Sequence, residues 1–538
     1  MAALMLEVLA HAGADVVFGL PGTHNLAFWA GAAEDRHCRL VNVRHEQTAV
    51  YAADGWARAT GRLGAALVTT GPGAANTLGA FGEAAMSGSA LVLIASEVPK
   101  RLSDAGMRRT LHQSPDQAGM FRCLAKGVFT PRSPAAAAED IVAAARLAQA
   151  PPAGPVYVDV PADILKSAAP SLDMGIGGAP TPVAPDEQGL AEAARLIERA
   201  GSVAIWAGGG VLAAGAGQDV AALARRWHAP VITTFGARGA IGYHPFDVVL
   251  PPHEPEVEGL LASAEVLVAL GTNFDGMMTK NANLRLPPVI VNVNVDLERA
   301  DCGYDEALVV LADAGAAARY FLDATPERAA GPGDAVAELR QKVWQRLRSD
   351  ARTAQAAEFV GSVERALAGG VVVVNDMTIA GYWLGNYYGA PRARLVQYPV
   401  GWGTLGYALP ASIGAAEAGT GPVLAVCGDG GLMFAVGELG TIAQERLPVT
   451  VLIVDDGGYG MLRYGHGAAR TAGTDLFMPD FLKLADAFGI PAVAVNDLGL
   501  PLERALARSV AAAAPQIVVC RASLTPPKTT SPRWEEPL

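Results

Sequence analysis

The chain has 538 residues, of which 51% are hydrophobic and 17% are charged. Its length suits about three domains, and its apolar content excludes a disordered chain. The net charge of −12 argues against a general nucleic-acid-binding protein, which needs a basic surface. It does not exclude an anionic ligand held by a cation or by helix N-termini.

The first elements in chain order are an amphipathic helix, predicted by Leu4, Leu6 and Leu9, and a strand at 16–18. Short apolar runs then recur, each followed by a glycine-rich turn and a helical pattern. Apolar runs that alternate with helices are typical of parallel sheets covered on both faces. The runs lie at 65–69, 91–95, 203–206, 266–270, 289–293, 371–374, 423–426 and 449–454.

Two breaks divide the chain. Residues 168–185 contain four Pro, three Gly and one charge, which is typical of a linker. A second break near 325–334 precedes a polar helical stretch at 335–368. The sequence therefore predicts an α/β protein with three doubly wound parallel-sheet domains, at 1–165, 186–325 and 336–538.

The outer two domains contain similar segments, 65–96 and 422–456. Both are predicted to form a strand, a Gly-x-Gly turn, a helix and a second strand. Gly71–Gly73 matches Gly428–Gly430 at a shift of 357, and an Ala/Gly-rich helix precedes each (49–60 and 406–416). Any two βαβ units look somewhat alike, but the shared order favours a duplicated domain whose copies have diverged.

Acidic residues follow two strands of the third domain. The turn of Gly428, Asp429, Gly430 and Gly431 ends one predicted strand, and the turn of Asp455, Asp456, Gly457, Gly458, Tyr459 and Gly460 ends the next. One helical crossover places such strand ends side by side, where open α/β sheets bind ligands. Asp429, Asp456 and a backbone carbonyl could then hold Mg²⁺, which prefers oxygen ligands and phosphate. The alternative is that these acidic residues only cap helices.

This pair of turns resembles the signature of thiamine-diphosphate-dependent enzymes. The resemblance extends along nearly the whole chain and points to the acetolactate synthase-like branch (large, catalytic subunit). The sequence is also similar to benzoylformate decarboxylase and benzaldehyde lyase. The motifs are FGLPG (18–22), RHEQTAVYAADGWARATGRLG (44–64), GPGAAN (71–76), GTLGYALP (403–410) and LTPPKTTSPRW (524–534).

The resemblance assigns roles to individual residues. Glu46 would bond the aminopyrimidine ring of thiamine diphosphate and supply the proton that makes its amine a base; read in isolation, it is an ordinary first-turn acid. Leu405 would hold the cofactor bent, although it could be a core leucine. Gln113 and Lys126 would contact substrate, although an exposed loop is an alternative. The implied cofactor contacts are Gly22, Glu46, Thr70, Asn76, Thr404, Leu405, Gly428, Asp429, Gly430, Gly431, Asp456, Gly458, Tyr459 and Gly460, with Asp429, Asp456 and Gly458 as metal ligands.

The sequence departs from the family pattern at several points. Asp455-Asp456 replaces the usual Asn pair, and Thr70 stands where aryl 2-oxo acid decarboxylases carry a histidine. Residues 271–275 replace a Gly-Ala-Arg-Phe-Asp motif of acetolactate synthases, which makes a bound FAD doubtful. In the middle domain, 208–210 opens a partial dinucleotide fingerprint, but no acidic residue ends the strand at 231–234. A structural turn is therefore favoured over NAD binding.

The resemblance implies a thiamine-diphosphate- and Mg²⁺-dependent enzyme. It would decarboxylate a small-molecule 2-oxo acid and ligate the resulting acyl anion equivalent to an aldehyde or ketone. A non-ligating 2-oxo acid decarboxylase and a non-catalytic binding homologue are the alternatives. The family shares each site between subunits, which implies at least a homodimer and favours a homotetramer.

We expect the protein to bind neither a membrane nor a nucleic acid. No apolar run reaches the ~18 residues of a membrane span. The first cationic residue is Arg36, so the start of a signal peptide is missing. The five Cys are scattered, without CxxC spacing, which favours free thiols in the cytoplasm.

Overall fold

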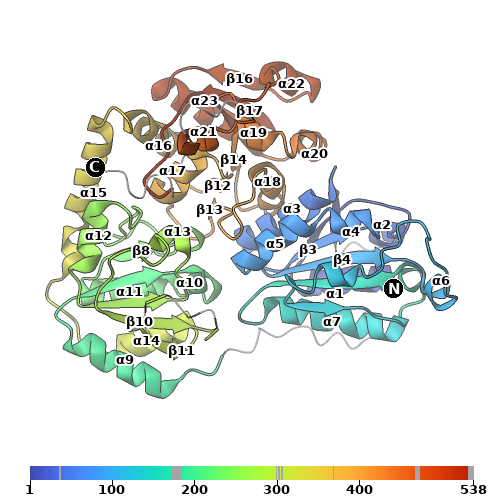
Figure 1. The fold of residues 1–538 in the computed structure, drawn as a ribbon, viewed down its shortest axis with the longest axis horizontal. Helices are drawn as coiled ribbons and strands as arrows, with labels where there is room; N and C mark the ends of the chain where they lie inside the picture. Colours follow the sequence, from blue (N-terminus) through green and yellow to red (C-terminus); the bar gives the residue numbers. More distant parts are fainter. Residues whose placement is uncertain are drawn as a thin grey trace.

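The computed structural model describes residues 1–34, 38–171, 183–298, 300, 303–304, 307–367, 369–466 and 473–530. They form three separate β-sheets, each flanked by helices (Figure 1). Every pair of neighbouring strands within these sheets is parallel. The predicted fold class is confirmed, and the strands lie where the apolar runs predict them. The domain boundaries drawn from the sequence stay a prediction.

The first sheet has the strand order β2-β1-β3-β4-β6-β5. Alternate side chains of its strands enter two different cores: Val17 and Leu67 pack with α1 and α7, whereas Phe18 and Val68 pack with α3 and α5. The strands are β1 (Val16–Gly19), β2 (Arg39–Asn42), β3 (Gly64–Val68), β4 (Leu91–Glu97), β5 (Gly127–Phe129) and β6 (Pro155–Pro161). The helices are α1 (Ala2–His11), α2 (Leu26–Glu34), α3 (Glu46–Thr60), α4 (Pro72–Ala75), α5 (Leu78–Ser87), α6 (Lys100–Asp104), η1 (Ala118–Met120), α7 (Pro134–Gln149) and α8 (Ala162–Leu165).

The third sheet repeats this order. Raising each label of the first sheet by eleven gives β13-β12-β14-β15-β17-β16, which is the order of the third. This identity supports the predicted duplication. The strands are β12 (Val372–Asn375), β13 (Val396–Gln397), β14 (Val423–Gly428), β15 (Val449–Asp455), β16 (Ala492–Val495) and β17 (Gln516–Arg521). The helices are η3 (Pro332–Ala335), α15 (Val336–Ser349), α16 (Ala354–Ala366), α17 (Ile379–Tyr387), α18 (Ala408–Glu417), α19 (Asp429–Leu432), η4 (Val436–Glu438), α20 (Leu439–Glu445), α21 (Gly460–His466), α22 (Phe481–Ala487) and α23 (Leu500–Ala511).

Helices α3 and α18, which precede equivalent strands, pack against each other between the outer domains (Figure 1). They approach so closely that a Cβ atom at Gly414 would lie 1.7 Å from the carbonyl oxygen of Ala52. The reciprocal Cβ at Gly55 would lie 2.1 Å from the carbonyl oxygen of Ala411. Only glycine fits at such a crossing. The outer domains consequently share one hydrophobic core.

The middle sheet has the order β11-β10-β9-β7-β8. One of its faces packs in a core of its own, and the other, with Trp206 and Leu267, joins the core of the outer domains. Gly208 and Gly210 pack directly on Gly271, where a Cβ at Gly208 would lie 2.2 Å from the Gly271 carbonyl oxygen. This contact supports the structural interpretation of the 208–210 turn. The elements are α9 (Glu187–Arg199), β7 (Val203–Ala207), α10 (Gly209–Ala213), α11 (Gly217–Trp227), β8 (Val231–Thr233), η2 (Phe235–Ala237), α12 (Pro255–Ala262), β9 (Val266–Leu270), α13 (Gly276–Thr279), β10 (Val289–Asn294), β11 (Ala307–Leu311) and α14 (Ala314–Ala324).

The polar helical stretch predicted at 335–368 is two helices. Helix α15 stops at Ser349 because Asp350 accepts the backbone N–H of Arg352 (2.9 Å) and Thr353 donates to the carbonyl of Leu347 (2.7 Å). Short polar side chains compete in this way with helix hydrogen bonds. Of the predicted linker, 168–171 and 183–185 form neither helix nor strand. Residues 172–182 and the end of the 524–534 motif (531–534) lie outside the described residues.

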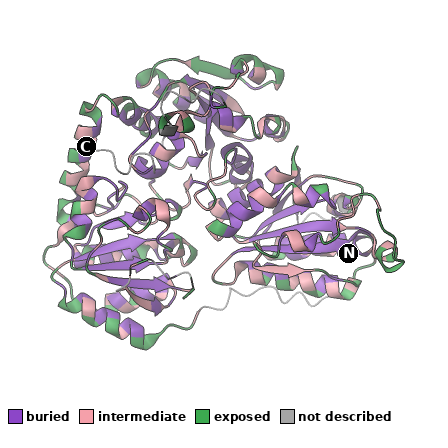
Figure 2. Cartoon of the chain, viewed as in Figure 1, coloured by how far each residue is buried: buried purple, intermediate pink, exposed green. Residues whose placement is uncertain are grey.

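Figure 2 shows the central strands of all three sheets as buried, the edge strand β16 as exposed and the outer helices as partly exposed. The chain's large apolar fraction is therefore used in sheets covered on both faces. Within the described ranges, no helix is both long and apolar enough to cross a membrane.

Candidate active site

The two acidic turns of the third domain meet at one edge of its sheet. Strands β14 and β15 are neighbours, with Gly428 in register with Val454. The carboxylate of Asp429 accepts the backbone N–H of Gly430 on Oδ1 (2.7 Å) and those of Gly457 and Gly458 on Oδ2 (2.7 and 2.8 Å). The predicted juxtaposition of the two strand ends is thus confirmed. We call this group, with Asp456, the C-terminal half-site.

Asp456 is half-buried beside Asp429. Arg463 of α21 donates to its Oδ1 (2.9 Å) and to its main-chain oxygen (2.8 Å). Burial and the nearby charge of Asp429 raise the pKa of Asp456 to about 6, and burial also raises the pKa of Asp429. A bound cation would relieve this repulsion, and a set of carboxylate and carbonyl oxygens fits a hard cation.

The side chains alone do not complete a metal site. Among the residues that the structure describes, no group of three or more His, Cys, Asp and Glu is arranged to hold a metal ion. The proposed ligand set of Asp429, Asp456 and the Gly458 carbonyl would therefore be completed by oxygens of the diphosphate. This is the way in which Mg²⁺ commonly binds at phosphate sites.

Glycines keep the second turn close to the first. Gly458 has φ +140°, and a Cβ there would lie 2.2 Å from the carbonyl oxygen of Thr474. A Cβ at Gly430 would lie 2.8 Å from the ring of Tyr459. Gly428, Gly431 and Gly460 are likewise closely packed, against Thr378, Asp376 and Asp456. The backbone surface thus fits a ligand that approaches the main chain directly.

Thr404 and Leu405, which are expected to contact the cofactor, lie just before α18. Leu405 is 37% exposed, so it is not a core leucine. Thr404 beside it is half-buried. Asp376, buried at the end of β12, accepts the backbone N–H of Gly406 on both oxygens (3.0 and 3.1 Å). Sequence reasoning missed Asp376, which fixes the backbone just after Leu405.

Glu46 lies in the first domain with other predicted residues, and we call this group the N-terminal half-site. It is the first residue of α3, and its Oε2 accepts a hydrogen bond from Asn76 (3.0 Å). A Cβ at Gly73 would lie 3.5 Å from Glu46 Oε1 and 2.7 Å from Thr69. Gly22 also packs on Thr69, because a Cβ at Gly22 would lie 2.6 Å from that side chain. Gly22, Glu46 and Asn76 therefore surround one strand end.

Thr70 is buried next to this group. Its hydroxyl lies 2.9 Å from His24 Nδ1 and 3.1 Å from Ser96 Oγ. The ring of His24 is 5.7 Å from the ring of His112, centroid to centroid. Burial, followed by the positive neighbours, lowers the pKa of His24. His112 was missed by sequence reasoning, and no motif points to it.

Gln113 follows His112 in a loop over the Gly71 turn. It is half-buried, and its Oε1 accepts the backbone N–H of Thr110 (3.2 Å). Its assignment to the substrate stays a prediction. The expectation for Lys126 is not supported, because its ammonium group donates to the carbonyls of Leu147 and Ala150 near the end of α7 (2.7 and 2.5 Å).

A buried polar network supports the Gly71 turn and was also missed. Gln117 accepts the Gly71 N–H and donates to the Ser96 carbonyl (3.0 Å) and to Asp159 Oδ1 (2.7 Å). Burial, followed by the charge of Glu97, raises the pKa of Asp159 to about 8. The network rigidifies the turn beside Thr70.

The fold and these two half-sites define a class of protein. Two domains with one strand order each present a glycine turn after the third strand of the sheet, a place where α/β proteins bind diphosphate-containing cofactors. Comparison of the sequence with models of known families finds three matches, all to domains of one enzyme family. Residues 1–120 match the N-terminal TPP binding domain of thiamine pyrophosphate enzymes, 190–321 the central domain, and 376–520 the C-terminal TPP binding domain. The chain therefore belongs to the thiamine pyrophosphate enzyme family.

Individual relatives agree with this assignment. The chain is 31% identical over 524 residues to a probable 2-ketoarginine decarboxylase of Pseudomonas aeruginosa, covering 93% of this chain and 90% of the relative. It is 29% identical over 541 residues to the acetolactate synthase large subunit of Parasynechococcus marenigrum, covering 96% and 86%. Among solved structures, the thiamine diphosphate-dependent 4-hydroxybenzoylformate decarboxylase of Rhodococcus jostii shares the fold, with a TM-score of 0.83 at 23% identity over 97% of this chain and 99% of that one.

Proposed function

We propose that the protein is a thiamine-diphosphate- and Mg²⁺-dependent enzyme that decarboxylates a 2-oxo acid and ligates the product fragment to an aldehyde or ketone. One observation carries the proposal: Asp429 hydrogen-bonds the Gly457–Gly458 turn and lies beside Asp456. Two acidic glycine turns that meet at a sheet edge suit a metal–diphosphate group. Acetolactate synthases among the relatives favour ligation.

Each half-site has its own task in this proposal. Asp429, Asp456 and the Gly458 carbonyl would hold Mg²⁺, while the glycine turns bind the diphosphate. Glu46, fixed by Asn76, would hold a proton at the pyrimidine ring. The bound cofactor supplies the electron sink for decarboxylation. Exposed Leu405 would set the bend of the cofactor by steric contact.

The 2-oxo acid would bind above the N-terminal half-site. His24 and Gln113 line this side and offer imidazole and amide groups, and the buried Thr70 hydroxyl hydrogen-bonds His24 from behind. Such neutral donors suit the carboxylate and ketone oxygens of a small substrate. FAD remains doubtful, because Thr272 and Asn273 stand where the acetolactate synthase motif has Ala and Arg.

We further propose a homodimer as the minimum assembly and a cytoplasmic homotetramer as the working form. Large apolar side chains are exposed around both half-sites, where a second copy would cover them. They are Leu26, Leu111, Trp402, Leu405, Met433, Phe434 and Leu462. Among the described residues, Cys123, Cys427 and Cys520 are free thiols, as is typical of a reducing compartment.

A second candidate function is 2-oxo acid decarboxylation without ligation. The relative at 31% identity carries the name of a probable decarboxylase, which favours it. The steps up to loss of carbon dioxide are common to both candidates. The two candidates differ in what reacts after carbon dioxide is lost: an acceptor aldehyde or ketone in ligation, or a proton in simple decarboxylation.

The test is a screen of 2-oxo acids for carbon dioxide release with thiamine diphosphate and Mg²⁺. Each active acid is then incubated with and without acceptor aldehydes, and the products are analysed. Coupled products support ligation, whereas an aldehyde as sole product supports the second candidate. If the protein shows no Mg²⁺-dependent thiamine diphosphate binding, it is a non-catalytic binding homologue.

A further inference from the structure

Among the described residues, each outer domain contains one buried glutamate a short distance after its glycine turn, ten residues after Gly73 in the first and eight after Gly430 in the third. Glu83 of α5 is 0% exposed and follows Gly82, and Glu438 of η4 is 1% exposed and follows Gly437. Both carboxylates accept hydrogen bonds from backbone N–H groups of the other domain. The contact between the outer domains is thus reciprocal.

Glu83 holds the segment that leads to Thr404 and Leu405. Its Oε1 accepts the backbone N–H of Gly401 (3.1 Å), and its Oε2 accepts that of Trp402 (2.8 Å). Ser87 (2.8 Å) and Arg58 (3.3 Å) donate to Oε1 as well. Both peptide groups are therefore bound to one side chain of the N-terminal domain.

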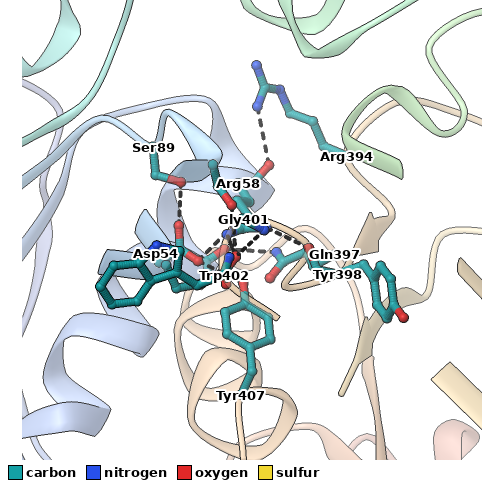
Figure 3. Close-up of polar contacts among 12 residues, drawn as sticks. Asp54, Arg58, Ser89, Arg394, Gln397, Tyr398, Gly401, Trp402 and Tyr407 are labelled. Carbon is teal, nitrogen blue, oxygen red and sulfur yellow. Dashed lines mark hydrogen bonds and ion pairs between the residues drawn. The ribbon is translucent and has the colours of Figure 1, made fainter. Parts of the chain in front are cut away.

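The ends of that segment have further hydrogen bonds to the first domain, as Figure 3 shows. Gln397 donates to the Gly55 carbonyl (2.9 Å), and Arg58 donates to the Tyr398 carbonyl (2.9 Å). Farther along, the Tyr407 hydroxyl donates to Asp54 (2.9 Å). Removal of the Glu83 contacts should consequently shift residues 401–405 without separating the domains.

Glu438 holds the segment that leads to Glu46. Its Oε1 accepts the backbone N–H of Arg44 (3.0 Å) and that of His45 (3.1 Å), and the Arg44 N–H also lies 3.2 Å from Oε2. The Thr441 hydroxyl donates to Oε2 (2.6 Å), and Thr48 also bonds this carboxylate. The first turn of α3, which begins at Glu46, is thus placed by the C-terminal domain.

We infer that Glu83 and Glu438 are reciprocal positioning residues, each fixing the cofactor-contacting segment of the other domain. The inference rests on the proposed function for the roles of Glu46, Thr404 and Leu405. Its physical basis is proximity: Glu46 follows His45 directly, and Thr404 lies two residues after Trp402. A misplacement of about 1 Å can lower an enzymatic rate roughly 100-fold.

The hydrogen-bond geometry predicts different effects for the substitutions Glu83→Gln and Glu438→Gln. At 438 both backbone N–H groups lie closest to Oε1, and only that of Arg44 also lies within 3.2 Å of Oε2. The Gln oxygen in the place of Oε1 can therefore accept both while its amide donates to the Thr441 hydroxyl. At 83 the two N–H groups meet different oxygens, so Gln leaves one of them facing an NH₂ group. An unsatisfied buried N–H is costly.

The experiment uses the full chain with thiamine diphosphate and Mg²⁺ and needs no substrate. It compares E83Q, E438Q and E438L by cofactor titration and by hydrogen–deuterium exchange of the thiazolium C2 proton in the bound cofactor. Unfolding midpoints and oligomeric state serve as folding controls. We expect E83Q to weaken cofactor binding roughly tenfold, E438L to slow exchange roughly tenfold, and E438Q to stay within about threefold of wild type in both.

Three results would overturn the inference. They are E83Q binding the cofactor as wild type does, E438Q impaired as severely as E438L, or losses that merely follow the unfolding midpoint. If E438L does not fold, the contrast between E83Q and E438Q still decides. A wild-type protein that fails to bind thiamine diphosphate would instead count against the proposed function.

Discussion

The crossing of α3 and α18 allows a stability prediction from measured distances. A Cβ added at Gly414 would lie 1.7 Å from the carbonyl oxygen of Ala52 and 2.8 Å from the backbone nitrogen of Trp56. Carbon–oxygen contacts normally begin near 3.3 Å, so Gly414→Ala must separate the helices by about 1.6 Å. The obstructing atoms belong to the backbone and cannot rotate away.

The expected cost follows from this separation. A radial gap of about 1 Å already forfeits up to about half of the dispersion energy of a contact. Overpacking costs about 1–3 kcal/mol, occasionally more, and alanine returns about 1 kcal/mol of helix propensity. With rigid backbone on both sides, we expect Gly414→Ala to lower the free energy of unfolding by about 2–3 kcal/mol.

The assay is urea unfolding of the purified protein, followed by tryptophan fluorescence. Gly259→Ala is the matched control, because Gly259 is exposed in α12 and a Cβ there would meet nothing within 4 Å. It should stabilise the protein by about 0.5–1 kcal/mol. A Gly414→Ala protein as stable as the Gly259→Ala protein would refute the close packing of α3 on α18.

Three further predictions concern the half-sites and their surroundings. Glu46→Gln should lower carbon dioxide release from an active 2-oxo acid by about 100-fold or more, and near-normal turnover would contradict its proton-holding role. Asp456→Asn should retain thiamine diphosphate binding but need more Mg²⁺, because a neutral ligand holds the cation less tightly; complete loss of binding in a titration would contradict this. Since folding raises the pKa of Asp159 to about 8, the folded state binds its proton more tightly than the unfolded chain, and the free energy of unfolding should fall as the pH rises from about 4 to 8. Asp159→Asn should remove that decrease and be relatively more stable at pH 8–9 than at pH 4, and an unchanged pH profile in denaturant unfolding would show that Asp159 does not titrate this way.

Local patterns predicted the strands and the acidic turns well. Apolar runs and glycine turns act over a few residues, and a single crossover fixes which strand ends meet, so the approach of Asp429 to Gly457 followed from sequence. The break between α15 and α16 within the predicted helical stretch was not predicted, and its cause is also local. Hydrogen bonds of Asp350 and Thr353 end the helix there, although the surrounding residues favour a helix.

Contacts between domains could not be predicted in the same way. The partners of Glu83 and Glu438 are more than 300 residues away, and only the packing of α3 on α18 brings them together. The pairs Gly82-Glu83 and Gly437-Glu438 are offset by 355 residues, whereas the glycine turns are offset by 357. A residue-by-residue comparison of the repeats at that shift therefore does not align the two glutamates.

The shared core of the outer domains also sets the timing of folding on the ribosome. Gly55 and Gly414 meet in that core although 359 residues separate them. At about 5–20 residues per second, the second helix is synthesised roughly 20–70 s after the first. Through that interval the α3 face of the N-terminal domain has no partner, so the nascent chain presents apolar surface that chaperones can bind.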